Sequence, residues 1–394
     1  MFHYTPFDDI IIIYDNFLTT SIKPHYSSGV VRRWHVMKSK KTFLSYMLLI
    51  AIQCMAPLGL FDAPLSPPEY RSEFISLNRI FVNLPNEEYD VEKANSIIDR
   101  ISVFPPKLID RLIAKNEKMK LINGRLTDEP EYEYLKGKTP RGWEDTGCTW
   151  DDVPGIGGNP IVVRIESCGG RDKSHSSVCL ELHEVAHRIN AIESTRISDG
   201  YDFKKLWKAE APILFENNQY FIDHCNEYFA ECYSMYLFDE DTKAALKKNA
   251  PLTYEFFSQD FFNALPKPDL SVYRFGGTKI CGGIYKNKIY DSYSDIVTDA
   301  YFKSSDHLYI AFAATNYGQS TDKPLRLSLW VDGKQIFFTY KGPIKSGQIC
   351  RFWNISIGKF SPGVHSIIYE VDSNYGVSET DENNNWTEYK IEVE

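Results

Sequence analysis

The chain has 394 residues, of which 43% are hydrophobic and 25% are charged. These values are typical of globular proteins and exclude a disordered chain, while the length indicates two or three domains. The formal net charge of −9 argues against a nucleic-acid-binding protein, because no basic stripe is present to neutralise phosphates.

Residues 37–62 follow the order of a secretory signal. A basic stretch that begins at Met37 precedes an apolar core of about eleven residues and then smaller residues, which predicts a signal peptide with Met37 as initiator. Residues 1–36 are then upstream translation or disordered sequence. The alternative is a membrane anchor, because residues 43–61 approach the roughly twenty residues that span a bilayer. The expected location is therefore extracellular, either as a secreted protein or as an anchored one that faces outside.

The next region, residues 66–265, predicts a domain of mixed helices and strands. Apolar residues three and four apart indicate helices, and short β-branched runs beside turn residues indicate strands. Helices are expected over 91–101 and 106–116, and strands over 79–84, 118–122 and 160–166. Strands that precede a buried helix and a helical second half are typical of an α+β domain.

Residues 183–187 read His-Glu-Val-Ala-His. On a helix, His183 and His187 lie on one face, so that both imidazoles can bind the same metal ion. Glu184 is angled towards water at that metal, where a general base must lie. The apolar flanks predict a buried helix, in which these polar groups need a metal ion or other partners. The pattern indicates a Zn²⁺ site, and a helix whose histidines are only hydrogen-bonded is the alternative.

A second group of candidate residues follows about forty positions later. Glu227 is suited to be the third metal ligand. Glu231 lies one helical turn beyond it and is interpreted as the acceptor for a ligand imidazole N–H, with a solvated surface carboxylate as the alternative. Tyr220 precedes Glu227 by seven positions, and core packing is its alternative interpretation because the chain has 25 tyrosines.

Three separated motifs occur in order at residues 141–155, 183–187 and 226–231. Together they resemble the catalytic domain shared by anthrax lethal factor and the secreted Pro-Pro endopeptidases, over about residues 74–260. The resemblance implies a zincin-like α+β fold and assigns the roles of the candidate residues. Zn²⁺ would be bound by His183, His187 and Glu227, with Glu184 as the catalytic base and Tyr220 as the active-site tyrosine that supports the oxyanion.

The substrate groove is less well defined by the sequence. Extended substrates of such domains lie along a sheet edge, and Trp143, Trp150 and the glycine-rich residues 155–158 are candidates to shape it. Core packing and loop flexibility are the alternatives. Asn226 is a further groove candidate, but some relatives carry an acidic residue there, so their substrate contacts do not transfer. The family includes enzymes that cut between two prolines, and the sequence leaves this preference open.

The last part of the chain predicts a β-sandwich. Residues 266–293 are rich in proline and glycine and indicate a linker, and the domain that follows covers residues 294–394. Asp332-Gly333 is a strong hairpin signal, and several short strands indicate a sandwich. Strands are expected over 308–314, 325–331, 336–340, 364–371 and 389–393.

The residues around 314–318 and 371–385 resemble the bacterial cell-adhesion-related (CARDB) Ig-like modules, over about residues 290–394. This resemblance implies a C-terminal all-β accessory domain with a cell-surface or matrix ligand. The complete chain is therefore expected to be a monomeric, secreted zinc-dependent endopeptidase that hydrolyses protein or peptide substrates. The alternative is a non-catalytic adhesion protein that keeps a degenerate zincin scaffold and binds through the sandwich.

Overall fold

The structure is a computed structural model that describes residues 70–167, 177–216, 218–263, 265–274, 282–288, 299 and 301–394. All of these residues belong to one unit, Ser66–Glu394. The expected signal or anchor segment 37–62 and the preceding residues 1–36 lie outside the described part. Among the described residues, no helix is long and apolar enough to cross a membrane.

A small mixed sheet supports the first half of the α+β region, which we call the mixed domain (residues 77–263). Its strand order is β2-β3-β5-β4. The first three strands are parallel, whereas β4 pairs antiparallel with β5 and forms an edge of the sheet. The strands are β2 (Val82–Asn83), β3 (Met119–Ile122), β4 (Gly155–Ile156) and β5 (Ile161–Arg164). The helices of this half are α3 (Leu77–Phe81), α4 (Val91–Arg100) and α5 (Pro106–Ala114).

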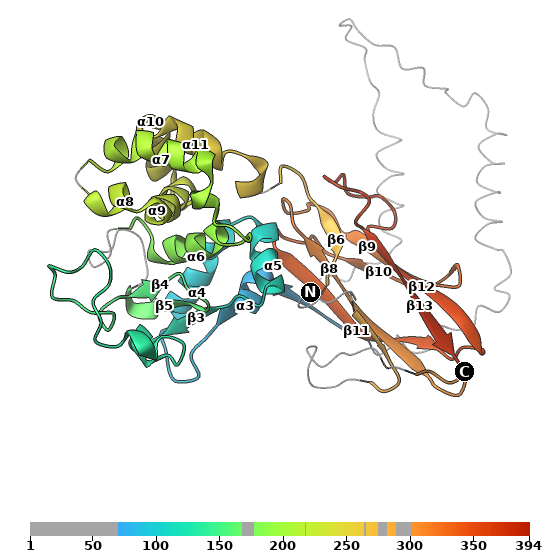
Figure 1. Ribbon diagram of the computed structural model, residues 1–394. Coiled ribbons are helices and arrows are strands. Elements are labelled where there is room, and N and C mark those ends of the chain that lie inside the picture. Colours follow the sequence, from blue (N-terminus) through green and yellow to red (C-terminus); the bar gives the residue numbers. More distant parts are fainter. Residues whose placement is uncertain are drawn as a thin grey trace, which may run out of the picture. The chain divides into compact units, whose positions relative to one another are not determined.

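The helix α6 (Leu180–Asn190) lies between this sheet and a group of five helices (Figure 1). These are α7 (Tyr201–Leu214), α8 (Gln219–Asp223), α9 (Cys225–Phe238), α10 (Glu240–Asn249) and α11 (Pro251–Phe257). Helix α9 is buried along residues 227–236, as expected for a helix that is apolar on nearly all sides. Its Tyr233 stacks on Phe257 of α11 with ring centroids 4.9 Å apart. The α+β class and the helical second half are therefore as predicted.

Two antiparallel sheets pack into the C-terminal sandwich, which confirms the predicted β-sandwich. One sheet has the order β1-β11-β8-β6, with β7 also paired to β8, and the other has the order β10-β9-β12-β13. Phe312 and Tyr369 stack across the core at 3.9 Å. The strands are β1 (Arg71–Ser76), β6 (Leu270–Val272), β7 (Gly282–Tyr285), β8 (Leu308–Asn316), β9 (Leu325–Val331), β10 (Lys334–Lys341), β11 (Gln348–Gly358), β12 (Gly363–Val371) and β13 (Trp386–Val393).

The predicted hairpin at Asp332-Gly333 is confirmed. It joins β9 to β10, which pair antiparallel. Both residues have positive φ, 49° and 77°, as a two-residue type I′ turn requires.

The strand predicted over residues 79–84 is wrong for its first half. Helix α3 continues to Phe81, and only Val82–Asn83 form a strand. The Ser76 hydroxyl accepts a hydrogen bond from the Asn78 backbone N–H and caps the helix. A short apolar run cannot be assigned to helix or strand from periodicity alone. Here the Ser76 cap stabilises the helix at the start of the run.

Two features of the sandwich differ from the expected boundaries. The predicted linker 266–293 contains β6 and β7, which are too short and too close to glycine and proline to be recognised by alternation. Strand β11 was not predicted, because a bulge between Phe352 and Ile355 and the positive φ of Asn354 interrupt its alternating pattern.

The sandwich and the mixed domain share a core. Strand β1, which the sequence grouped with the mixed domain, pairs antiparallel with β11. Tyr273, Ala313 and Ile349 of the sandwich belong to the same buried apolar cluster as the helices of the mixed domain. The Tyr317 hydroxyl of the sandwich donates a hydrogen bond of 2.8 Å to Asp110 of α5. These contacts predict that the two parts stabilise each other.

Replacing Tyr317 by phenylalanine tests this coupling. Burial raises the pKa of Asp110, and the Tyr317 hydroxyl opposes that shift, so the variant leaves a buried carboxyl group with one donor fewer. We expect the free energy of unfolding to fall by about 1–3 kcal/mol, measured by urea denaturation. Tyr375→Phe is the control, because its side chain is 73% exposed. Equal effects of the two substitutions would contradict the coupling.

Candidate metal centre and active site

Helix α6 presents its polar motif from a buried position. His183 is 2% exposed and Glu184 is 4% exposed, while the helix packs against β5 on one side and α9 on the other. The segment after β4 passes very close to this helix. A Cβ atom at Gly157 would lie 2.4 Å from His187 Cβ and 2.8 Å from the Glu184 carbonyl oxygen. A glycine is therefore required where the sheet edge meets the helix that carries both histidines.

Three side chains converge on one point between α6 and α9. The Nε2 atoms of His183 and His187 are 3.1 Å apart. Glu227 Oε2 lies 3.4 Å from the first of these nitrogens and 3.2 Å from the second. Tetrahedral zinc with bonds of about 2.0–2.1 Å places its ligand atoms about 3.3–3.4 Å apart. The spacing and the N, N, O donor set therefore fit a zinc ion, and the structure brings together the three ligands that the sequence predicted.

Burial and hydrogen bonding determine how this cluster ionises. Burial opposes protonation of His183, but hydrogen bonds to Glu227 and Glu231 outweigh it and raise the pKa of His183 to about 10. Burial also opposes ionisation of Glu227, but hydrogen bonds from both histidines lower its pKa below the usual range of a glutamate. The cluster without metal thus holds a proton that a bound cation would replace.

Glu231 supports the first histidine from α9. Its Oε2 lies 3.0 Å from His183 Nδ1, and its Oε1 accepts a hydrogen bond of 2.8 Å from the Val178 backbone N–H. Glu231 is 1% exposed, so the alternative of a solvated surface carboxylate is wrong. An acceptor at Nδ1 fixes the ring so that Nε2 points towards the metal position.

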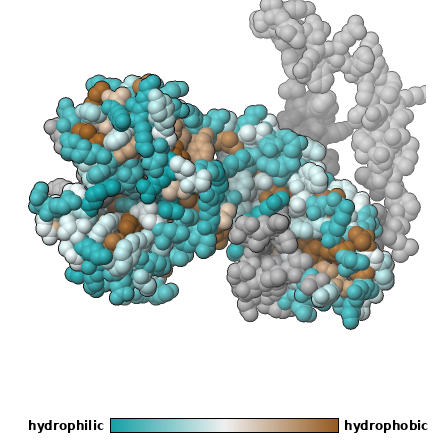
Figure 2. Space-filling model, viewed as in Figure 1, coloured by the Kyte–Doolittle hydropathy of each residue, from teal (hydrophilic) through white to brown (hydrophobic). Residues whose placement is uncertain are grey.

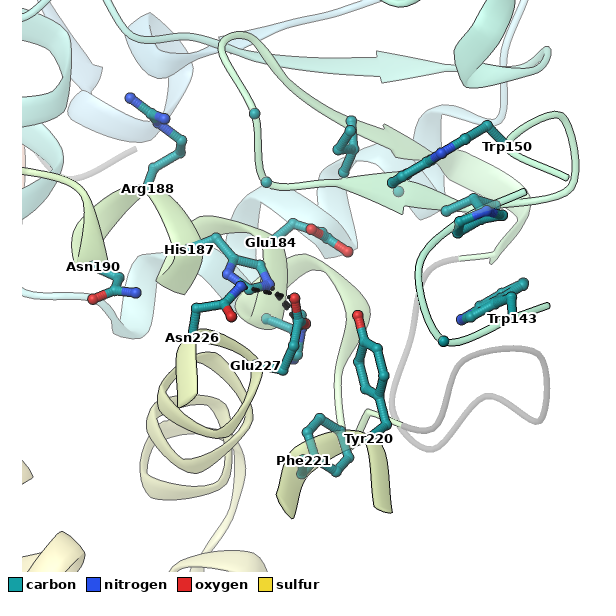
Figure 3. Close-up of a pocket in the computed structure, with 18 of the residues that line it drawn as sticks. Trp143, Trp150, Glu184, His187, Arg188, Asn190, Tyr220, Phe221, Asn226 and Glu227 are labelled. Atoms are coloured by element: carbon teal, nitrogen blue, oxygen red, sulfur yellow. Dashed lines mark hydrogen bonds and ion pairs between the residues drawn. The ribbon is translucent and has the colours of Figure 1, made fainter. Parts of the chain in front are cut away.

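Glu184 lies in the same cavity as the three converging side chains (Figure 3). Burial is the main cause that raises the pKa of its carboxyl group, and the two histidines oppose the shift. A hydrogen bond from the Gly157 backbone also opposes the shift. The carboxyl group thus lies beside the metal-type cluster, in a cavity large enough to admit water or a substrate.

Tyr220 projects into the cavity from α8, and Figure 3 shows its hydroxyl directed into the space beside Glu184 and Glu227. The Asn218 side chain caps α8 by accepting a hydrogen bond from the Tyr220 backbone N–H. A Cβ at Gly142, which has a φ of +82°, would lie 2.9 Å from the Tyr220 ring, so this glycine allows the loop to pack against the tyrosine. Burial and the negative charge of Glu227 raise the pKa of Tyr220. The phenol therefore remains a hydrogen-bond donor at neutral pH.

The cavity has a volume of about 970 Å³ and is lined by all of the predicted groove candidates, which are Trp143, Trp150, residues 155–158 and Asn226. Trp143 lines it and also packs against the apolar cluster that contains Val153 and Val162. Asn226 lines it and donates a hydrogen bond of 2.9 Å to Glu227 Oε1. In the view of Figure 2, hydrophilic residues cover most of the visible surface of the mixed domain. The cavity contrasts with that surface, because aromatic side chains line one of its ends.

Several residues at the site were missed by the sequence analysis. The Arg141 guanidinium lies 3.8 Å from Glu227 Oε1. Arg188, Asn190 and Arg196 line the cavity beyond His187. No local pattern identifies these residues, because their positions depend on how the loops around α6 pack.

Comparisons with known proteins identify relatives of this chain. Residues 71–260 match the family model described as anthrax toxin lethal factor, N- and C-terminal domain. A Pro-Pro endopeptidase of Paenibacillus alvei is 37% identical over 227 residues, which make up 58% of this chain and the whole length of that relative. A Pro-Pro endopeptidase of Clostridioides difficile is 41% identical over 181 residues, 46% of this chain and 81% of that relative.

Two solved structures are also similar. The structure of the Paenibacillus alvei enzyme matches with 39% identity and a TM-score of 0.44, covering 46% of this chain and 98% of the enzyme. The CARDB domain of a Pyrococcus furiosus protein matches with 14% identity and a TM-score of 0.25, covering 33% of this chain and 92% of that domain. The sequence matches are the stronger result, because one of them spans a complete relative at 37% identity. On that ground the chain belongs to the Pro-Pro endopeptidase family and is a metalloendopeptidase.

Proposed function

We propose that this chain is a secreted, zinc-dependent endopeptidase that hydrolyses proline-containing protein or peptide substrates. The observation that carries the proposal is the cluster of His183, His187 and Glu227, whose ligand atoms lie within 4.8 Å of one another. Glu184 and Tyr220 line the same cavity. The preference for proline is supported by the names of the two relatives, and secretion is supported by the signal-like residues 37–62.

The choice of zinc follows from the donor set. Two imidazole nitrogens and one carboxylate oxygen are the ligands of many catalytic zinc sites, in which a fourth position stays open. Zinc bound there supplies Lewis acidity, which polarises a carbonyl group and makes water a better acid. His183, His187 and Glu227 would hold such an ion at the cavity wall, where it would be accessible to a peptide substrate.

The roles of the protein groups follow from their positions. Glu184 accepts a proton from the attacking water and passes it to the departing amine nitrogen. The Tyr220 hydroxyl donates a hydrogen bond to the oxyanion that develops on the carbonyl oxygen. Glu231 holds the His183 ring in place through Nδ1. The edge strand β4 beside α6 offers backbone groups along which an extended peptide aligns.

The alternative of a non-catalytic adhesion protein lacks support. The chain belongs to a peptidase family, with residues 71–260 matching the lethal factor model, and the candidate base and tyrosine both lie in the cavity with the metal-type cluster. Purified protein should contain about one zinc ion per chain and should cleave a pool of proline-containing peptides until a chelator is added. Stoichiometric zinc without any cleavage of the pool would contradict the proposal.

Substitution of Glu184 by glutamine should keep the zinc but reduce hydrolysis by at least about 10²- to 10⁴-fold, because the proton acceptor is lost. The measurement is the initial rate on the best peptide of the pool, with metal content determined in parallel. Glu255→Gln, an exposed position on α11, is the matched control. Near-normal turnover by zinc-loaded Glu184→Gln would exclude Glu184 as the base.

Substitution of Tyr220 by phenylalanine should lower kcat by roughly 10²- to 10³-fold and leave KM nearly unchanged, because the hydroxyl acts on the oxyanion of the transition state. Steady-state kinetics with one peptide separates the two parameters. Tyr201→Phe serves as the control, since Tyr201 is 81% exposed. An unchanged kcat would assign Tyr220 to packing alone.

Zinc affinity should increase with pH between 6 and 8. The pKa of His183 is raised to about 10 in the protein without metal, so the cluster is protonated throughout this range, and zinc binding must release a proton. Each released proton makes the apparent affinity rise about tenfold per pH unit. Competition with a chromophoric chelator at constant ionic strength measures this slope. A flat profile would show that the cluster without metal is already deprotonated at neutral pH.

A further inference from the structure

The active-site cavity has two chemically different ends. Figure 3 shows Trp143 and Trp150 on one side of Glu184 and Glu227, and Asn190 on the other side. Trp143 and Trp150 make the first end aromatic. The end at Asn190 is lined by two arginines, Arg188 and Arg196. A peptide that extends in both directions from the metal position therefore meets an apolar end and a cationic end.

The two arginines differ in whether their charge is already paired. Arg188 forms an ion pair with the buried Glu117. Arg196 is exposed, and no ion pair of its guanidinium occurs among the described residues. The two acidic residues of the same loop are engaged elsewhere, since Glu193 pairs with Arg111 and Asp199 pairs with Lys204. Among the described residues, Arg196 is therefore the charged side chain of the cavity, outside the metal cluster, that forms no ion pair.

The loop that carries Arg196 is held firmly at both ends. The Asn190 side chain donates to Ser198 Oγ at 2.9 Å and accepts from the Ser198 backbone N–H at 2.8 Å. The Arg196 carbonyl accepts the Asp199 backbone N–H at 3.0 Å and begins a short 3₁₀ helix. Asn190 is itself 1% exposed. The backbone at Arg196 is therefore positioned by a buried clamp, and only the long side chain is free to adjust to a ligand.

We infer that Arg196 is a specificity-determining residue that binds the carboxylate of an aspartate or glutamate in the peptide substrate. The acidic residue lies on the side of the scissile bond opposite to the side that contacts Trp143 and Trp150. This inference rests on the proposed peptidase function of the cavity. An arginine suits the task because its planar guanidinium forms paired hydrogen bonds with a carboxylate. Its exposure keeps the gain moderate and sensitive to salt.

The test measures binding separately from hydrolysis. The zinc-loaded Glu184→Gln variant is titrated with fluorescent octapeptides that have Pro-Pro at the centre and carry Asp, Asn or Lys at one flanking position at a time. At one of the flanking positions, the peptide with Asp should bind roughly two- to fivefold more tightly than the peptide with Asn. This is the range expected for an exposed ion pair. The preference should decrease when the salt concentration is raised.

Three further substitutions, each added to the Glu184→Gln variant, test whether Arg196 causes the preference for the Asp peptide. Arg196→Glu should make the Lys peptide the preferred one at that same position, and Arg196→Lys should retain the preference for Asp. Lys208→Glu makes the same change of charge at an exposed site that is not part of the cavity, and it should leave the preference for Asp as it was. Thermal unfolding of each variant checks that the fold is intact.

The outcomes separate this inference from the proposed function. No charge preference at any position, or an equal effect of Lys208→Glu, would overturn the role of Arg196 even if the wild-type protein cleaves the peptides. A preference that reverses in Arg196→Glu would support the role of Arg196 even if the wild-type protein cleaves none of them. In the latter case only the proposed hydrolysis would be contradicted.

Discussion

The contact between α6 and α9 is the constraint on which the site depends. It brings two imidazoles and two carboxylates together in a region where unpaired polar groups would be costly. His183 illustrates how they are satisfied, because Glu231 lies at its Nδ1 and Glu227 lies near its Nε2. The same arrangement leaves the Nε2 atoms of both histidines directed at one point. Polar groups that the fold must pair internally are therefore also arranged as metal ligands.

Two glycines near the α6–α9 contact determine which groups lie next to the three converging side chains. Gly157 allows the segment after β4 to lie against α6, so that the sheet edge runs beside the histidines. Gly142 has a similar role on the other side of the cavity, where its lack of a side chain leaves room for the ring of Tyr220. Two close backbone approaches thus place the sheet edge and the Tyr220 hydroxyl on either side of the three converging side chains. Larger residues at these glycines would separate groups that have to act together.

The sequence predicts those parts of the structure that depend on local pattern. Helical spacing was sufficient to place His183 and His187 on one face, and a family resemblance, not spacing, assigned Glu227 and Tyr220 their roles. Strand β11 was missed because its bulge interrupts the alternation. The pairing of β1 with β11 joins residues that are about 280 positions apart in the chain, and no local signal reports such a contact. Arg196 was missed for a related reason, because its place in the cavity depends on the clamp between Asn190 and Ser198.

The pairing of β1 also bears on how the sandwich relates to peptidase activity. The Paenibacillus alvei relative is matched along its whole length by 58% of this chain, so the remaining part is an addition relative to that enzyme. The sandwich strands that follow residue 263 are not held by a flexible connection alone, because β1, which lies inside the matched residues 71–260, completes their sheet by pairing with β11. Strand β1 ends at Ser76, which caps α3 directly, and the chain returns to the sandwich after residue 263. With two connections and a shared apolar cluster, loosening of the sandwich removes packing from α3 and α5, which pack against each other and contact strand β2 of the mixed sheet and helix α6, respectively. The physical expectation is that the accessory domain influences activity through the stability of that sheet, in addition to any ligand that it binds.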